Sequence, residues 1–243
     1  MRKPAQHNLT YAIVEKLGHA IVTGVYGKDN AFPIEAELCK QLDASRSVLR
    51  EAVKMLTAKG LLTARPRQGT SIAPEQHWNL LDPDVLRWLL ERKFSLSLLA
   101  EFTEVRLAIE PMAARLAARH ATPASIERMQ HAIERMKAAE KGEDDALASD
   151  VAFHVSVLHA SGNRFYMQFE ELIDTALRIS IRVTNQFKGV AIANVGHHRK
   201  VLNAIEERNE AKAYTAMEGI LLEVMKLIET TRRRAKAAAA ARQ

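Results

Sequence analysis

Apolar side chains recur at helical spacing from residue 83 to residue 236, and no stretch after residue 75 alternates with the two-residue period of a β-strand. Short breaks that contain proline, glycine or polar residues divide this tract. The expected helices lie near 83–92, 95–119, 123–140, 143–160, 163–187, 194–208 and 210–236. Helices joined by such short turns pack as an antiparallel bundle. We therefore predict a mainly α protein whose C-terminal domain, 95–231, belongs to a bundle of six or seven helices.

The N-terminal part of the chain follows a different pattern. An apolar stripe over 9–23 precedes two short helices, about 35–42 and 46–59, which are joined by a tight polar turn. An alternating stretch then follows, interrupted by a proline and a glycine, which is typical of a small β-hairpin. A helix-turn-helix followed by a basic hairpin forms a winged helix, whose second helix can lie in the DNA major groove. We predict such a domain over 8–73, with the recognition helix at about 46–59.

The charge distribution agrees with a polyanionic partner for the N-terminal domain. Residues 1–75 hold 11 Lys and Arg against 7 Asp and Glu, and residues 232–243 add five positive charges and no negative one. The chain between them is mildly acidic, although the whole sequence carries +6. A basic front segment on an acidic body favours binding to DNA. The basic tail, 232–243, is expected to be a fraying, solvated helix end, with a contact to DNA as the alternative.

Several classes of protein lack their characteristic signals here. No apolar run approaches the roughly 20 residues of a membrane span, and the N-terminus has no apolar signal core, so we expect a cytoplasmic protein without a membrane partner. The H-E-x-x-H motif, a glycine-rich phosphate loop and a nucleophile elbow are missing, so an enzyme is not expected. The single Cys39 cannot form an internal disulfide and is expected to be a small buried residue rather than a nucleophile.

The N-terminal segment resembles the GntR family of regulators over residues 10–73. The matching residues are Pro33, Glu35, Leu38, Ser45–Arg46–Ser47, Val48, Arg50–Glu51–Ala52, Leu56, Gly60–Leu61 and Gly69–Thr70. The outward side chains of the second short helix are expected to be Ser45, Arg46, Ser47 and Arg50. The resemblance implies that DNA is contacted by Arg46 and Arg50, with Ser47, Val48 and the Gln68–Gly69 wing tip close by. Ser45 suits both an N-cap and a phosphate contact.

The helical part resembles the FadR branch of the same family, between about 105 and 225. The matching residues are Glu104–Val105–Arg106, Ile109–Glu110, the run from Ala113 to Ala118, Asp150, Phe153–His154, His198–Arg199 and Ala204–Ile205. The linker sequence HWNLLDPDVLRWLLE resembles that of D-galactonate-responsive repressors and other sugar-acid sensors. The resemblance implies a homodimeric repressor of a sugar-acid operon that binds operator DNA and is released by a small carboxylate such as an aldonate. A metal-responsive or effector-independent regulator is the alternative, and a metal-assisted hydrolase is the least favoured.

A candidate metal site lies inside the predicted bundle. Asp150 and His154 are four residues apart, so their side chains project from one face of a helix, near apolar neighbours. His198 opens a later helix, and imidazoles with a carboxylate suit Zn, Ni or Mn. The resemblance implies a fourth ligand, a histidine, where this chain has Ile220. Three ligands would leave positions for water or effector oxygens. A metal-free polar pocket and a purely structural role are the alternatives.

Three arginines are candidate partners of an acidic effector: Arg106, Arg178 and Arg182. A guanidinium binds a carboxylate through two parallel hydrogen bonds. The resemblance gives this role to Arg106, which could instead pair with Glu104 or Glu110.

The segment 74–94 is predicted to be a linker followed by the first helix of the bundle. Its two tryptophans, Trp78 and Trp88, are expected to pack the two domains together, and an aromatic platform for a ligand is the alternative.

Overall fold

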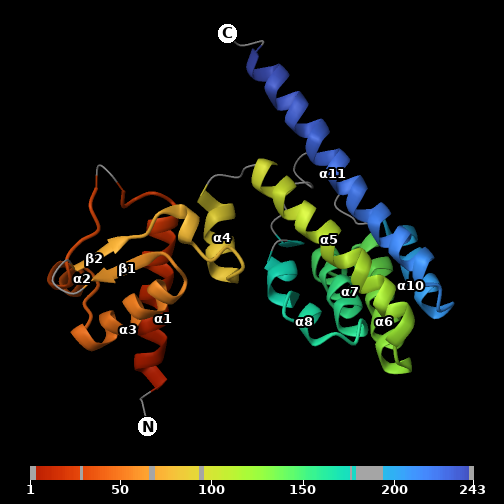
Figure 1. Ribbon diagram of the computed structural model, residues 1–243, viewed down its shortest axis with the longest axis horizontal. Helices are drawn as coiled ribbons and strands as arrows, with labels where there is room; N and C mark the ends of the chain where they lie inside the picture. Colours follow the sequence, from red (N-terminus) through yellow and green to blue (C-terminus); the bar gives the residue numbers. More distant parts are fainter. Residues whose placement is uncertain are drawn as a thin grey trace. The chain divides into compact units, whose positions relative to one another are not determined.

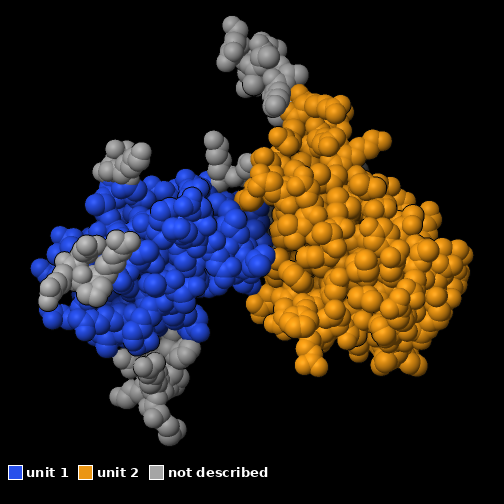
Figure 2. All heavy atoms as spheres, viewed as in Figure 1, with its two compact units in different colours: residues 1–94 blue, residues 95–243 orange. Residues whose placement is uncertain are grey.

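The computed structural model of the chain describes residues 4–27, 30–65, 69–92, 96–175, 177–178 and 194–240. The chain separates into two compact units, residues 1–94 and residues 95–243, coloured blue and orange in Figure 2. Helices and a two-stranded hairpin make up the described part of unit 1, and helices make up the described part of unit 2 (Figure 1). The predicted fold class, a mainly α protein with an N-terminal helix-turn-helix and a helical C-terminal domain, is confirmed.

Unit 1 has the element order of a winged helix. Its elements are α1 (Pro4–Val22), α2 (Glu35–Gln41), α3 (Arg46–Ala58), β1 (Leu62–Arg65), β2 (Gly69–Ile72), the 3-10 turn η1 (Glu75–His77) and α4 (Pro83–Arg92). The two strands pair antiparallel, from Leu62 opposite Ile72 to Arg65 opposite Gly69. The hairpin therefore follows the second helix of the helix-turn-helix directly.

Local sequence explains why α3 begins where it does. Asp43, in the turn after α2, has a φ of 46°, a left-handed conformation that aspartate tolerates better than most residues. Ser45 then caps α3, because its side chain accepts a hydrogen bond from the backbone N–H of Val48 at 3.4 Å. The buried face of the helix consists of Val48, Leu49, Ala52 and Leu56. Arg46 and Arg50 lie on the exposed face.

Gly60 determines how the chain leaves α3. Its φ is 77°, and a Cβ at this position would lie 2.1 Å from the backbone oxygen of His77. Nearby, the backbone N–H of Asn79 donates to the carbonyl of Lys59 at 3.0 Å. The segment after the hairpin thus returns to the end of α3 and packs on it at backbone distance.

Helix α4 belongs to unit 1, which corrects the prediction that 74–94 supplies the first helix of the bundle. Trp88 is completely buried and Trp78 is 8% exposed, and both lie in the core that α1 and α3 build. A Cβ on Gly18 of α1 would lie 2.3 Å from the Trp88 ring, so the glycine makes room for the indole. Gly18 thus lets α4 close onto α1 through Trp88, and both tryptophans pack in the core of unit 1.

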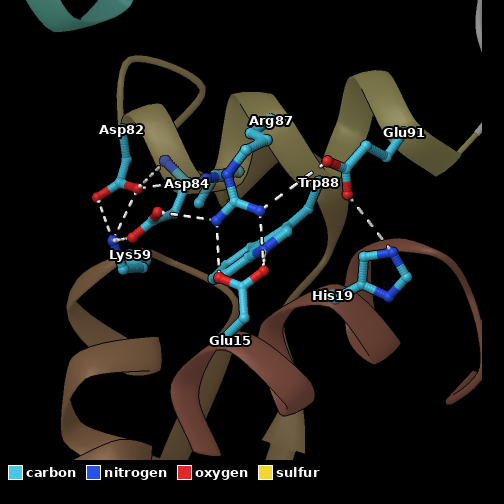
Figure 3. Close-up of polar contacts among 9 residues, drawn as sticks. Glu15, His19, Lys59, Asp82, Asp84, Arg87, Trp88 and Glu91 are labelled. Atoms are coloured by element: carbon cyan, nitrogen blue, oxygen red, sulfur yellow. Dashed lines mark hydrogen bonds and ion pairs between the residues drawn. The ribbon is translucent and has the colours of Figure 1, made fainter. Parts of the chain in front are cut away.

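A polar network fastens α4 and the preceding turn to α1 and α3 (Figure 3). The ammonium of Lys59 donates to Asp82 at 2.7 and 2.8 Å and to Asp84 at 2.9 Å. Arg87 of α4 donates to both oxygens of Glu15 on α1, at 2.8 and 2.7 Å. Burial alone would lower the pKa of Lys59, but its hydrogen bonds to the two aspartates raise it overall, so the ammonium stays charged.

Unit 2 consists of helices that pack on one another through small and apolar faces. They include α5 (Leu96–His120), α6 (Pro123–Glu140), α7 (Ala146–Ala160), α8 (Arg164–Met167), α10 (Val195–Glu206) and α11 (Glu210–Ala240). α5 packs against α11 and α7, α6 packs against α7, and α10 lies against α11, α6 and α5. Four fully buried alanines of α5, Ala113, Ala114, Ala117 and Ala118, allow its neighbours to approach closely.

The helix starts in this unit are set by side-chain caps. Thr122 and Ser125 form a capping box at the start of α6, and Asp145 and Asn194 cap α7 and α10. The predicted helix 163–187 is interrupted: after α8 a turn at 168–169 intervenes before helix resumes at residue 170. Residue 176 and residues 179–187 of that prediction lie outside the described residues.

No helix within the described ranges is long and apolar enough to cross a membrane.

Candidate functional site

Helices α7 and α10 bring Asp150, His154 and His198 together in the interior of unit 2. All three side chains are buried, and one potential ligand atom from each lies within 4.8 Å of the others. The Nε2 atom of His198 is 3.1 Å from Oδ1 of Asp150 and 3.4 Å from Nε2 of His154. Nε2 of His154 is 3.9 Å from the same oxygen. The three residues singled out in the sequence therefore converge on one point.

The Nδ1 nitrogen of each imidazole, which points away from the cluster centre, is also engaged. Nδ1 of His198 lies 2.9 Å from the carbonyl oxygen of Asn194, and Nδ1 of His154 is hydrogen-bonded to the carboxylate of Glu110. Because these partners are acceptors, a neutral imidazole carries its proton on Nδ1 and leaves the Nε2 lone pair free. Both lone pairs then face the centre of the cluster. This is the arrangement by which proteins orient histidine ligands of a metal.

The buried carboxylate of Asp150 supplies a further donor atom to the same point. Although Oδ1 is 3.1 Å from His198, the approach lacks hydrogen-bond geometry, and the oxygen has no hydrogen-bond partner in the described part of the chain. An unsatisfied buried oxygen is unfavourable unless a cation or donor meets it. Two imidazole nitrogens and this oxygen form a donor set that fits a divalent Zn, Ni or Mn ion.

Electrostatics keep both carboxylates of this region ionised. Burial raises the pKa of Glu110, but Arg106 and His154 offset this and bring it to about 2. Burial likewise opposes ionisation of Asp150, and His198 and His154 leave its pKa below the ordinary value. For His198 burial lowers the pKa, and the carboxylate of Asp150 more than compensates, so the net shift is upward. Negative charge at the centre is thus available to a cation.

Arg106 is engaged inside the protein. The residue is 2% exposed, and its Nε donates to Oε1 of Glu110 at 2.5 Å. This is the ion-pair alternative that the sequence left open. Glu110 consequently joins Arg106 to His154, a link between α5 and α7 that sequence reasoning missed because the two partners are 44 residues apart.

The other candidate effector residues are less completely described. Arg178 donates through Nε and Nη2 to Asp174, at 2.8 Å each, and is partly exposed. Arg182 lies outside the described residues. Ile220, at the position of the implied fourth metal ligand, is a buried residue of α11 with no donor atom.

The predicted DNA-contact residues are mostly exposed. Ser45, Arg46, Ser47 and Arg50 lie on the open face of α3, and Gly69 is exposed at the start of β2. Val48 differs, because it is 5% exposed and packs into the core beneath α3, so its side chain supports the helix. Gln68 lies outside the described residues. Cys39 is partly buried and packs against the same core, which matches the structural interpretation of that cysteine.

Two domain families match this chain. Residues 9–72 match the bacterial regulatory proteins of the gntR family, and residues 101–223 match the FCD domain.

Regulators of known sequence and a solved structure are similar to this chain. The galactonate operon transcriptional repressor of Escherichia coli (strain K12) is 35% identical over 171 residues, which cover 70% of this chain and 75% of that protein. The HTH-type transcriptional regulator YieP of the same organism is 30% identical over 219 residues, or 89% of this chain and 94% of that one. The solved structure of Lar, which controls the agr system of Listeria monocytogenes, has a TM-score of 0.58 at 14% identity, covers 95% of this chain and 98% of that chain, and shows the fold alone.

Proposed function

Since the chain belongs to the bacterial GntR family of regulatory proteins and carries an FCD domain, we propose that it is a dimeric repressor of a sugar-acid operon. The proposed effector is a small carboxylate such as an aldonate, whose binding releases the operator. The chain is a transcriptional regulator and not an enzyme, because both domains and both relatives are those of regulators. The sugar-acid effector is supported by the similarity to a repressor of a galactonate operon.

The exposed face of α3 is the observation that carries the DNA-binding part of the proposal. Arg46 and Arg50 project from this face beside Ser47, and the second helix of a helix-turn-helix enters the major groove. Gly69 at the start of β2, with Gln68 before it in the sequence, would then lie near the backbone or minor groove. Two-fold symmetry in a homodimer would place two such helices on half-sites about one helical turn, roughly 34–36 Å, apart.

In the FCD domain, we propose that Asp150, His154 and His198 hold a divalent ion. A bound ion would supply a concentrated positive charge next to any carboxylate that enters the bundle. Ile220 provides no fourth ligand, so water or an effector oxygen would complete the coordination. The support for this proposal is the unsatisfied oxygen of Asp150, which lies beside two inward-facing Nε2 atoms.

The contacts of the candidate arginines indicate how they could pair with an acidic effector. Arg106 and Arg178 are already paired, with Glu110 and Asp174 respectively, so their charges are largely compensated. If either binds the effector, it does so by exchanging its present carboxylate partner for the effector. Arg182 remains the third proposed cation.

Release of DNA requires that the effector bind the two arrangements of the DNA-reading domains with different affinity. A gel-shift titration of the full-length protein on an operator selected from randomised DNA tests this. We expect a complex at low salt that galactonate or another aldonate dissociates, and weaker aldonate sensitivity after chelation. Absence of any operator complex would contradict the regulator's proposed DNA binding, and a complex indifferent to aldonates would contradict the proposed effector.

The same titration separates a second candidate, a metal-responsive regulator, which the buried donor cluster favours. In that case chelator or added metal alone changes operator affinity, and aldonates have no effect. His154→Ala should abolish the metal response, whereas His131→Ala, an exposed histidine of α6, should leave it intact.

A further inference from the structure

We infer that Glu35 of α2 determines the sequence specificity of the DNA-binding domain by holding the guanidinium of Arg50 in one orientation. The inference rests on the proposed binding of operator DNA by α3. It concerns a residue that does not need to touch DNA itself and acts through Arg50, so Glu35 is a positioning residue.

The contact between the two side chains is bidentate. Nε of Arg50 donates to Oε2 of Glu35 at 3.0 Å, and Nη2 donates to Oε1 at 3.2 Å. Glu35 lies in the first turn of α2 and Arg50 in the middle of α3, so the pair bridges the two helices of the helix-turn-helix. Two parallel hydrogen bonds fix both the position and the plane of the guanidinium.

The donors that remain on Arg50 suit a base edge. A guanidinium has five N–H groups, and the pair with Glu35 uses one on Nε and one on Nη2. Both N–H groups of Nη1 and the outer one of Nη2 stay available. This outer edge is the fork that arginine offers to O6 and N7 of guanine in the major groove.

Stability does not explain why these two long side chains are paired. The side chain of Arg50 is 65% exposed and that of Glu35 is 40% exposed, and ion pairs at such exposure are screened by water and salt. The hydrogen bond from Arg50 lowers the pKa of Glu35, so the carboxylate is ionised at neutral pH. The pair therefore orders an arginine before DNA arrives, which reduces the conformational entropy lost on binding.

The location of Glu35 and Arg50 also supports a role in DNA recognition. Glu35 and Arg50 line a groove of about 430 Å³ that the hairpin residues Ala64, Gly69 and Thr70 also line. The pair thus faces the space between the recognition helix and the wing. Arg46, on the same face of α3, forms no ion pair with any described residue, so this pre-orientation distinguishes Arg50.

The test uses the full-length protein and double-stranded DNA. An operator is first selected from a randomised library with the wild type. Binding constants are then measured for every single-base-pair variant of one half-site, with wild type, Glu35→Gln, Glu37→Gln, Arg50→Ala and the double variant Glu35→Gln/Arg50→Ala. Glu37→Gln is the matched control, because it removes the same charge from α2 at an exposed residue without an ion pair in the described structure.

We expect Arg50→Ala to relax specificity at one base pair of the half-site. Glu35→Gln should relax the same base pair by about tenfold, a part of the roughly 1–3 kcal/mol that a bidentate arginine–guanine contact discriminates. Glu37→Gln should keep wild-type discrimination, and Glu35→Gln should have no further effect in the Arg50→Ala background. The salt dependence of Glu35→Gln should match that of Glu37→Gln, because neither change removes a phosphate contact.

Other results overturn the inference in distinguishable ways. If Glu35→Gln matches Glu37→Gln at every base pair, or weakens all sequences equally, Glu35 does not position Arg50 for recognition, while operator binding stands. If the wild type selects no sequence, the proposed operator binding falls and the inference falls with it. Equal melting temperatures of the two variants exclude a loss of fold as the cause.

Discussion

Glu110 contacts two buried side chains with one carboxylate. Arg106 donates to it from one turn earlier on α5, and His154 reaches it from α7. Its pKa of about 2 keeps it ionised across the physiological range. As an acceptor it fixes the His154 proton on Nδ1, which leaves Nε2 for the cluster centre. Glu110, which is not one of the three proposed metal ligands, therefore controls the orientation of His154, which is.

The first prediction concerns this residue. Replacing Glu110 by Gln removes the ionised acceptor, so the affinity for Zn or Ni should fall by about 10- to 100-fold, as is usual when the partner of a ligating histidine is lost. Titration calorimetry on metal-free protein measures the change.

The control is Glu104→Gln, which alters the same charge at an exposed position of the same helix. Because Glu110→Gln leaves Arg106 buried without its partner, the paired variant Arg106→Met/Glu110→Gln should recover melting temperature without recovering metal affinity. Unchanged metal affinity in both Glu110 variants would show that this carboxylate does not orient His154.

The second prediction concerns Glu15, which accepts two hydrogen bonds from Arg87 and one from the Trp88 indole at 2.9 Å. The hydrogen bond from Arg87 lowers its pKa below the ordinary 4.5. A lowered folded pKa means that the stabilisation is fully present above about pH 4.5 and is lost as the pH falls through the folded value.

Glu15→Gln should therefore lower the melting temperature of unit 1 at pH 7, and the difference from wild type should shrink as the pH falls below 4.5. Melting curves at a series of pH values give this comparison, with Glu37→Gln as the reference. A constant difference at all pH values would mean that packing, and not the charge of Glu15, accounts for the effect.

At the scale of the helices, close packing reverses an ordinary preference. Replacing a glycine in a helix interior by alanine usually stabilises by about 1 kcal/mol. At Gly18 the new Cβ would lie 2.3 Å from the fully buried ring of Trp88, so we expect Gly18→Ala to destabilise unit 1. At Gly219 of α11 no atom lies within 4 Å of the new Cβ, so Gly219→Ala should stabilise. Calorimetric unfolding of both variants checks the opposite signs; stabilisation by both would indicate that α4 is displaced easily from α1.

The helix boundaries could be predicted because their signals are local. Thr122 and Pro123 mark the start of α6, and Asn194 marks the start of α10. The expected and observed helix ends therefore differ by only a few residues. The partner of α4 could not be predicted in the same way. Its periodic pattern specifies an apolar face but not the surface that covers this face. The space beside Gly18 that the Trp88 ring fills exists only once α1 has folded.

The candidate site could be predicted from the sequence only in part, for a similar reason. Asp150 and His154 share a helix face by their spacing, and the family resemblance supplied His198. The supporting contacts of Glu110 and Asn194 were not visible in the sequence, because one joins helices distant along the chain and the other uses a backbone carbonyl. The pair of Glu35 and Arg50 was missed too, although both residues stand in the family motif, since their contact depends on how α2 crosses α3.

At the scale of the whole molecule, unit 1 forms a core that is complete only with α4. Trp88 and Val85 are both fully buried in it, and Lys59 has its carboxylate partners in the segment before and within α4. A fragment of residues 1–92 should therefore unfold cooperatively on heating. A fragment of residues 1–73 should not, because it exposes the surface that α4 covers and leaves Lys59 unpaired. Circular dichroism melts of the two fragments decide between these outcomes, and equal cooperativity would show that α4 is dispensable.

That α4 belongs to unit 1 has a practical consequence for exchanging DNA-binding domains between regulators. The match to the gntR family ends at residue 72, which makes that position an obvious place to join a foreign DNA-binding domain to this FCD domain. A junction there would separate Lys59 from Asp82 and Gly18 from Trp88, and each half of the chimera would carry one side of a mismatched contact. A junction after Arg92 keeps α4 with the DNA-binding domain that it packs against. Recombination at that point should therefore change which operator is bound, and it does not require the two parent proteins to have matching α4 surfaces.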